Sequence, residues 1–132
     1  MDASRRTSLL VEDDPDIRSE MRIALEGMGL EVIEAASGRQ AVDSLAEIVP
    51  DLVVLDLMLP EVSGFEVCEL IRSAPPLQHV PVLVTSARGL PQDRAEAEDC
   101  GADEYLVKPF TQRELASAVR RLLWPTVRKI AR

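Results

Sequence analysis

Short apolar runs recur at nearly regular intervals along the chain. They cover residues 9–11, 30–33, 52–55, 82–84 and 105–107. Each run is short enough to be a strand, and polar or turn-forming residues bound it. Strands that are buried on both faces have continuous rather than alternating hydrophobic residues. The pattern therefore predicts a parallel sheet that is covered on both sides.

Segments with helical spacing separate these runs. Asp14 and Pro15 fit the cap and first-turn proline of the first helix, and Gly29 closes it. Apolar positions mark the first helix at Ile17, Met21, Leu25 and Met28, the second at Ala41, Val42, Leu45 and Ile48, the third at Phe65, Cys68 and Ile71, and the fifth at Leu115, Val119, Leu122 and Leu123. The fourth segment, from about Pro91 to Cys100, has mainly alanine at these positions, so we expect it to be marginal and mobile.

The strict alternation of strands and helices predicts an α/β fold of the (βα)₅ type. Right-handed crossovers then place helices on both faces of the sheet. A length of 132 residues, with 46% hydrophobic and 29% charged residues, fits one globular domain. We assign residues 1–124 to this domain and the basic segment 125–132 to a short tail or the start of a linker.

Charge and cysteine content exclude several other classes of protein. A net charge of −8 argues against a surface for nucleic acid, so we expect no direct nucleic-acid partner. Cys68 and Cys100 have no spacing typical of a zinc site or a disulfide framework, so we expect two reduced packing residues. The first apolar run is too short for a signal peptide or a membrane span, so we expect a cytoplasmic protein without a membrane partner.

Residues that can carry chemistry follow the predicted strands. In doubly wound sheets, the functional site lies at the carboxyl ends of the strands. The residues at these ends are Glu12, Asp13 and Asp14 after the first strand, Asp56 at the third, Thr85 and Ser86 at the fourth, and Lys108 and Pro109 at the fifth. We expect them to converge on one edge of the sheet.

Asp56 differs from an ordinary loop acid. An isolated acid at a strand end is commonly a helix cap, and Asp14 fits that role. Asp56 follows the apolar run 52–55 and should be partly enclosed. Neighbouring carboxylates repel each other by about 4 kcal/mol per pair at 4 Å and an effective dielectric near 20, so a cation must offset the repulsion. Mg²⁺ prefers a few carboxylates together with waters and phosphate oxygens.

A carboxylate beside Mg²⁺, with a lysine and a hydroxyl nearby, is the set needed for phosphoryl transfer to a carboxylate. Asp56 is the expected nucleophile, and Glu12 and Asp13 are the expected metal ligands. Lys108 and Ser86 would bind the remaining phosphoryl oxygens.

At these residues the sequence resembles the receiver domains of two-component response regulators. The resemblance covers residues 7–124 and includes the acidic pair Glu12 and Asp13, Asp56 within DLVVLDLMLPEVSG, Ser86 within PVLVTSARG, and KPF at Lys108 and Pro109. Spacing from Pro81 selects Ser86 rather than Thr85, which should point to the opposite face of the strand. The segments DLMLP and SARG are most similar to receivers attached to winged-helix DNA-binding domains.

The resemblance implies a flavodoxin-like sheet with strand order 2-1-3-4-5 and a phosphoacceptor at Asp56. It further implies that the backbone carbonyl of Met58 is a ligand of Mg²⁺, that Pro60 and Gly64 shape the loop, and that the Lys108–Pro109 bond is cis. Ser86 and Tyr105 would act as the switch. The implied phosphodonor is a sensor histidine kinase or a phosphotransfer protein, and the only catalysis is the domain's own phosphorylation and dephosphorylation.

Two finer expectations concern the output and the phosphoryl lifetime. The face made by the fourth helix, fifth strand and fifth helix carries charges resembling those through which related regulators pair as homodimers, namely Arg94, Asp103, Glu104 and Glu114. Ala118 stands where that subfamily has an arginine, so at least one intersubunit ion pair would be missing. Met58 and Arg88 are expected to flank the phosphoryl group and hinder water.

Three alternatives remain at this point. A phosphohydrolase of the haloacid dehalogenase type also uses an aspartate, a lysine and Mg²⁺, but it wants Asp-x-Asp where this chain has Asp56 followed by Leu57 and Met58. A receiver-like module could bind partners without being phosphorylated. The chain could also be the front half of a transcription factor, whose DNA-binding part lies elsewhere.

Overall fold

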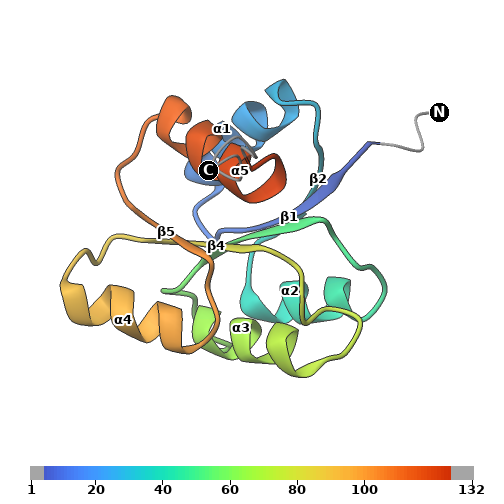
Figure 1. The fold of residues 1–132 in the computed structure, drawn as a ribbon, viewed down its shortest axis with the longest axis vertical. Coiled ribbons are helices and arrows are strands. Elements are labelled where there is room, and N and C mark those ends of the chain that lie inside the picture. The colour runs from blue at the N-terminus through green and yellow to red at the C-terminus, as the bar shows by residue number, and fades with distance from the viewer. Residues whose placement is uncertain (1–4, 126–132) are drawn as a thin grey trace, which may run out of the picture.

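A five-stranded parallel sheet lies at the centre of the molecule. The computed structural model describes residues 5–125, and Figure 1 shows their arrangement. The strands are β1 (Thr7–Val11), β2 (Glu31–Ala35), β3 (Leu52–Asp56), β4 (Val82–Ser86) and β5 (Glu104–Val107). Their spatial order is β2-β1-β3-β4-β5, and all four pairings are parallel. The expected flavodoxin-like, doubly wound fold with strand order 2-1-3-4-5 is confirmed.

Helices cover both faces of the sheet (Figure 1). One face carries α1 (Pro15–Gly27) and α5 (Gln112–Leu123), and the other carries α2 (Gly38–Leu45), α3 (Gly64–Ser73) and α4 (Pro91–Asp99). Alternate strand residues feed the two cores, so that Leu9 and Val53 belong to one and Leu10 and Val54 to the other. Removing one such side chain from water contributes about 1.5–3 kcal/mol, which makes these two cores the main source of stability.

Local signals explain where the helices begin and end. The Asp14 side chain accepts hydrogen bonds from the backbone amides of Asp16 and Ile17 at the start of α1, and Gly29 follows its end with a φ of +90°. Capping boxes at Ser63 and Thr111 open α3 and α5. The weak fourth segment does form a helix, in which only Asp93 and Ala97 are buried. The mobility expected for it stays a prediction.

The observed element limits correct the expected ones in places. Helix α2 ends at Leu45, so Ile48 lies outside the helix to which its apolar character assigned it. The strands β3 and β4 end at Asp56 and Ser86 as expected, because the ladder of backbone hydrogen bonds continues past the last apolar residue. No helix among residues 5–125 is long and apolar enough to cross a membrane. Apart from Pro125, the tail assigned to 125–132 lies outside the described residues.

Candidate phosphoacceptor site

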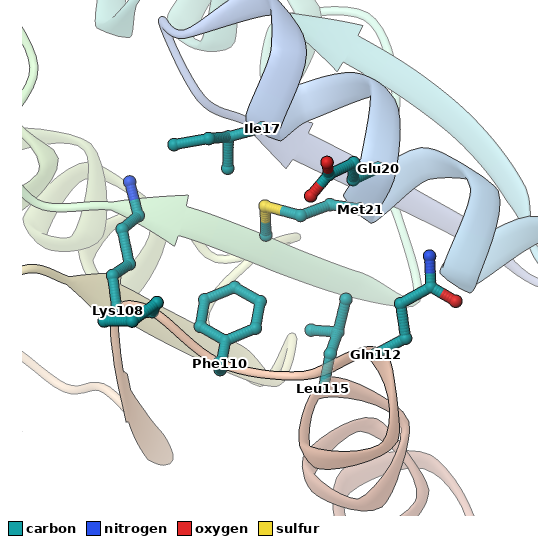
Figure 2. Close-up of a pocket in the computed structure, with 8 residues that line it drawn as sticks. Ile17, Glu20, Met21, Lys108, Phe110, Gln112 and Leu115 are labelled. Carbon is teal, nitrogen blue, oxygen red and sulfur yellow. The ribbon is translucent and has the colours of Figure 1, made fainter.

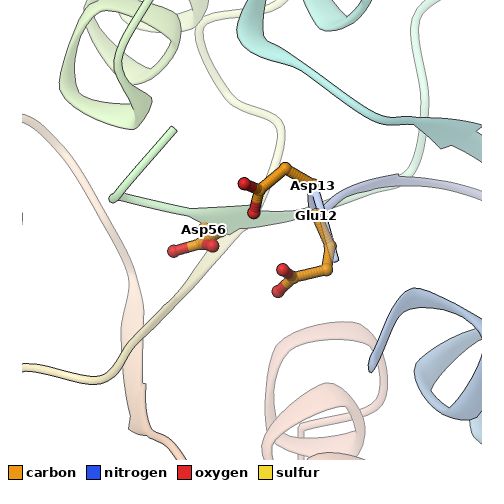
Figure 3. A group of neighbouring side chains, drawn as sticks. All are labelled: Glu12, Asp13 and Asp56. Atoms are coloured by element: carbon orange, nitrogen blue, oxygen red, sulfur yellow. The ribbon is translucent and has the colours of Figure 1, made fainter. Parts of the chain in front are cut away.

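Three acidic side chains meet at the carboxyl ends of β1 and β3. Glu12 and Asp13 follow β1, Asp56 ends β3, and one carboxylate oxygen from each lies within 4.8 Å of the others. Figure 3 shows the three side chains gathered at this edge. Glu12 and Asp56 are buried, whereas Asp13 is exposed. The structure therefore brings together the three side chains that the sequence proposed as metal ligands.

Lys108 is the cation that faces this cluster. Its Nζ lies 2.6 Å from Oε1 of Glu12 and 3.1 Å from Oδ2 of Asp56. Burial by itself would lower the pKa of Lys108, but the hydrogen bond to Glu12 and the charge of Asp56 outweigh this effect and raise the pKa above its ordinary value. The lysine is consequently protonated at neutral pH and joins two acids that would otherwise repel each other.

Glu12 is held in place from several sides. Its side chain is only 1% exposed, and its Oε2 accepts a hydrogen bond from the Asp14 amide at 3.1 Å. Burial raises the pKa of Glu12 above its ordinary value, and the contact with Lys108 partly counteracts that effect. The Arg18 guanidinium donates to the Glu12 carbonyl at 2.8 Å, which fixes the backbone where it leaves β1.

The loop after β3 is packed tightly against Asp56. Oδ1 of Asp56 accepts a hydrogen bond from the Met58 amide at 3.0 Å, so the other carboxylate oxygen faces Lys108. Gly64 starts α3 directly against the strand end, and a Cβ there would lie 2.4 Å from the Asp56 carbonyl oxygen and 2.6 Å from the Leu57 Cα. Only glycine fits this approach, in agreement with the loop-shaping role expected for Gly64.

The two adjacent hydroxyls of β4 have different surroundings. Both Thr85 and Ser86 are buried. Oγ of Ser86 accepts a hydrogen bond from the Arg88 amide at 3.1 Å. Oγ1 of Thr85 has no hydrogen-bond partner within the described part of the chain. As consecutive strand residues they point to opposite faces, so only one of them can serve a given site.

Tyr105 is connected to the same loop. Its side chain is buried, and its hydroxyl donates to the Arg88 carbonyl. The Arg94 guanidinium lies over its ring, 4.9 Å from the ring centre. A chain of hydrogen bonds thus runs from Ser86 through the backbone of Arg88 to the buried Tyr105.

A buried acid on α4 was missed in the sequence. Asp93 is 4% exposed, its Oδ2 accepts from the Leu90 amide at 3.2 Å, and its Oδ1 lies 3.4 Å from Nε of Arg88. The highly charged segment 92–99 made Asp93 look like one solvated acid among several. Its place in the first turn after Leu90 and Pro91 is the signal that could have identified a capping role.

A hydrophobic cavity of about 160 Å³ opens beside Lys108 (Figure 2). It lies between α1 and α5 and is lined by Ile17, Glu20, Met21, Lys108, Pro109, Phe110, Gln112 and Leu115. The peptide bond between Lys108 and Pro109 is cis, as the resemblance implies. The site therefore has an apolar surface on one side and the acidic cluster on the other.

Two of the four charges expected to pair across a homodimer already have ion-pair partners within the chain. Asp103 accepts from Arg72 at 2.8 Å, and Glu104 pairs with Arg121 at 3.0 Å. Ala118, where the related subfamily has an arginine, is 1% exposed and belongs to the core beneath α5. A homodimer through this face would have to exchange at least some of these contacts.

The donor set fits a hard divalent cation. Three carboxylates around one point are typical ligands of Mg²⁺, which also retains waters and phosphate oxygens. Soft ligands are absent from this set, since all three are carboxylates. Glu12, Asp13 and Asp56 would hold the ion, and the carbonyl of Met58 stays an expected fourth contribution.

Comparison with known sequences identifies a matching family and several relatives. Residues 9–120 match the family described as the response regulator receiver domain. The DNA-binding dual master transcriptional regulator RpaA of Synechocystis sp. is 42% identical over 120 residues, covering 91% of this chain and 50% of the relative. The response regulator MprA of Mycolicibacterium vanbaalenii is 43% identical over 115 residues, covering 87% of this chain and 49% of that protein.

Solved structures with the same fold include receivers of several kinds. The chemotaxis protein CheY4 of Vibrio cholerae superposes with a TM-score of 0.87 at 29% identity, covering 91% of this chain and all of that one. The receiver domain of the sensor histidine kinase PA1611 from Pseudomonas aeruginosa superposes with a TM-score of 0.83 at 31% identity, covering 91% and 98%. That structure has a magnesium ion coordinated in its active-site cleft.

The chain spans about half the length of the curated relatives named above. RpaA is described as DNA-binding, so the comparisons give no support to the expectation that nucleic acid is not a partner. That expectation rests on the net charge of this chain alone. The matched residues contain nearly all of the sheet, the acidic cluster and Lys108, and the chain accordingly belongs to the receiver domains of two-component response regulators.

Proposed function

We propose that this domain accepts a phosphoryl group on Asp56 and changes its binding partners in response. The observation that carries the proposal is the arrangement around Lys108, whose ammonium group contacts Asp56 while Glu12 and Asp13 lie beside the same carboxylate. A purely structural ion pair would not need a third acid at that point. A site that binds both a divalent cation and a phosphoryl group does need it.

In the proposed reaction, Oδ2 of Asp56 attacks the phosphorus of a phosphohistidine. A P–O bond forms as the P–N bond to the imidazole breaks, and the imidazole leaves with the bonding electron pair. The bond from the Met58 amide holds Oδ1 and so orients the attacking oxygen. Bound Mg²⁺, held by Glu12, Asp13, Asp56 and the Met58 carbonyl, supplies positive charge that offsets the charge of the phosphoryl oxygens.

Lys108 and Ser86 would contact the transferred group. Lys108 stands 3.1 Å from the attacking oxygen and can move its contact to a phosphoryl oxygen once the attacking oxygen has become part of the acyl phosphate. The Ser86 hydroxyl, which can rotate, would donate to another phosphoryl oxygen while its bond from the Arg88 amide is retained or exchanged. Both residues then act on charge that appears only when the phosphoryl group arrives.

Output would follow from the hydrogen-bond chain between the site and β5. A shift of Ser86 toward the phosphoryl group moves the Arg88 segment, to which the Tyr105 hydroxyl is bonded. The face formed by α4, β5 and α5 would change with it, and this face is the proposed surface for a homodimer in the activated state. Exchange of the internal pair between Glu104 and Arg121 for an intersubunit pair is one way to form that dimer.

The proposed phosphodonor is a sensor histidine kinase or a phosphotransfer protein. The apolar cavity beside Lys108 supports a protein donor, because an apolar side chain of that protein could enter it while the phosphohistidine faces Asp56. We further propose that residues 1–124 form the whole domain, that it is cytoplasmic and that it catalyses only its own phosphorylation and dephosphorylation. In a longer protein of the RpaA type, its output would be regulation of an attached domain.

Incubation with acetyl phosphate and Mg²⁺, followed by mass spectrometry of the intact protein, tests the chemistry. We expect one phosphoryl group per chain and complete loss of labelling in Asp56→Asn, because the amide is not a nucleophile of comparable strength. Chelation of Mg²⁺ by EDTA should prevent labelling of the unaltered protein. Labelling that survives either change would contradict the assignment.

Two rival functions are tested by the same material. Continuous release of phosphate from p-nitrophenyl phosphate would favour a phosphohydrolase. A protein that is never labelled, yet retains its partners, would favour a module that works without phosphorylation.

A further inference from the structure

Asp93 is a buried carboxylate that the proposed chemistry does not use. It lies in the first turn of α4 with 4% exposure, outside the cluster of Glu12, Asp13 and Asp56. A buried charge is unfavourable unless hydrogen bonds and an opposite charge compensate it. The partners of Asp93 must therefore stabilise its charge and, with it, the first turn of α4.

Comparison with two other capping residues shows that Asp93 is unusual. Glu66 and Glu114 occupy the same position in the first turns of α3 and α5, where each accepts a hydrogen bond from the backbone amide of its cap residue. Both are exposed, and neither has an ion pair among residues 5–125. Asp93 makes the same backbone contact, at 3.2 Å from the Leu90 amide, and adds the Arg88 guanidinium at 3.4 Å.

Arg88 connects Asp93 to the rim of the phosphoacceptor site. Its backbone amide donates to Ser86, and its carbonyl accepts from Tyr105. Its guanidinium NH1 lies 3.9 Å from Sδ of Met58, two residues after the phosphoacceptor. The arginine side chain is 58% exposed, so it is free to turn between the helix and the site.

We propose that Asp93 and a phosphoryl group on Asp56 compete for the guanidinium of Arg88. This inference rests on the proposed phosphorylation of Asp56. The aspartyl phosphate would bring about two negative charges and several acceptor oxygens, against one charge on Asp93. A guanidinium can bind two such oxygens at once, which favours the phosphoryl group over the single contact with Asp93.

The exchange would release the first turn of α4. Once Arg88 turns away, Asp93 is left buried without a cation, and the helix loses one of its two buried side chains as a stable anchor. Arg88 thereby forms a second connection between the site and the output face, separate from the backbone chain that leads to Tyr105. It also covers the phosphoryl group against water.

The lifetime of the phosphoryl group tests this competition. The variants are Asp93→Asn, Arg88→Gln and the double substitution, with Glu66→Gln as the matched capping control. Each protein is labelled with acetyl phosphate and then diluted to the same concentrations of Mg²⁺ and donor. The fraction of protein that still carries the phosphoryl group is then followed over time by intact mass spectrometry. Asp93→Asn keeps an acceptor for the Leu90 amide but frees Arg88, so the half-life should lengthen by about two- to fivefold, as expected for the loss of one ion pair whose arginine is exposed to solvent.

The double substitution decides whether Asp93 acts through Arg88. Arg88→Gln should shorten the half-life, and the double variant should decay at the rate of Arg88→Gln alone. Glu66→Gln should decay like the unaltered protein. An Asp93→Asn effect of equal size in both arginine backgrounds, or no effect in either, would overturn the proposal.

Hydrogen exchange of the amides in α4 gives a readout that does not depend on hydrolysis. Beryllofluoride with Mg²⁺, a mimic of aspartyl phosphate, should speed exchange of the amides of Leu90 and of residues 92–94 in the unaltered protein, and Arg88→Gln should lose most of that response. Equal responses in both proteins would overturn the inference. Failure to label the unaltered protein at all would instead contradict the proposed function, so the two failures are distinguishable.

Discussion

The two ends of the sheet hold their acidic side chains in opposite ways. At the amino end, Asp51 precedes β3 and accepts from the amide of Thr7 at 2.8 Å, while Asp103 precedes β5 and accepts from the amide of Val82 at 2.8 Å. Each acid joins the starts of two neighbouring strands. At the carboxyl end, three acids converge on one point, and a single lysine contacts two of them, Glu12 and Asp56.

Arg72 completes the arrangement at the amino end. It donates to the carbonyls of Gly101, Gln78 and Val80 and pairs with Asp103 at 2.8 Å. Asp51, Arg72 and Asp103 thus have partners of a kind that any stable fold could use. The carboxyl end keeps a surplus of negative charge instead, which lowers stability and is useful only for binding a cation. Acids that have partners within the fold thus indicate a structural role, whereas a surplus of acids at one point indicates a binding site.

Substitution of one acid at the carboxyl end should have the largest effect on the rate of labelling. Asp13→Asn should slow labelling by acetyl phosphate about 100-fold at limiting Mg²⁺, because a direct ligand is lost, and extra Mg²⁺ should restore part of the rate. Its stability should hardly change, since Asp13 is exposed. Labelling is followed by intact mass over a series of Mg²⁺ concentrations.

The matched change at the other end is Asp51→Ala. It removes the bond to the Thr7 amide and should lower the free energy of unfolding by about 1 kcal/mol, without changing the labelling rate. If Asp51→Ala slowed labelling as Asp13→Asn does, the two ends would not be functionally distinct.

Arg72 tests the amino end more severely. Arg72→Ala removes the donor to three backbone carbonyls and the ion pair of Asp103, which keeps its bond from the Val82 amide, and should destabilise the protein by about 2 kcal/mol in urea unfolding. Arg39 pairs with Asp43 on the surface of α2, so Arg39→Ala should change stability by no more than about 0.5 kcal/mol. Equal effects of the two substitutions would show that the Arg72 network is not a stabilising unit.

The adjacent hydroxyls of β4 provide the finest test. Ser86→Ala should slow labelling about tenfold, the usual effect of losing one hydrogen bond to a charged group. Thr85→Val removes a buried hydroxyl that has no partner among the described residues, so stability should rise by about 1 kcal/mol with labelling unchanged. A labelling defect in Thr85→Val would indicate that Thr85, and not Ser86, contacts the phosphoryl group.

Much of this site follows from the sequence because its residues are tied to strand ends. Continuous apolar runs located the strands, and the rule for doubly wound sheets then brought Glu12, Asp56 and Lys108 to one edge. The strand order was implied by the resemblance and not by periodicity. The predicted limits of the elements were less accurate where an apolar residue lies outside the regular hydrogen bonding of a helix. Ile48 is an example, because it is apolar but lies beyond the end of α2.

Asp93 and Arg72 could not be found in this way. Their importance depends on burial and on partners far along the chain, since Arg72 contacts Asp103 across 31 residues. Helix α4 has few large apolar side chains, so periodicity gave no indication of which of its acids faces inward. Contacts of this kind need coordinates, because no local pattern distinguishes a buried acid from its solvated neighbours.

Because Gly64 has no side chain, α3 can begin in direct contact with the end of β3, and this restricts movement on that side of the site. With α3 beginning in backbone contact with Asp56 and Leu57, that helix and the end of β3 are packed too closely to move independently. If Asp56 is phosphorylated as proposed, the resulting displacement is expected in the segments that follow β4 and β5, because the packing on the α3 side leaves no room for it.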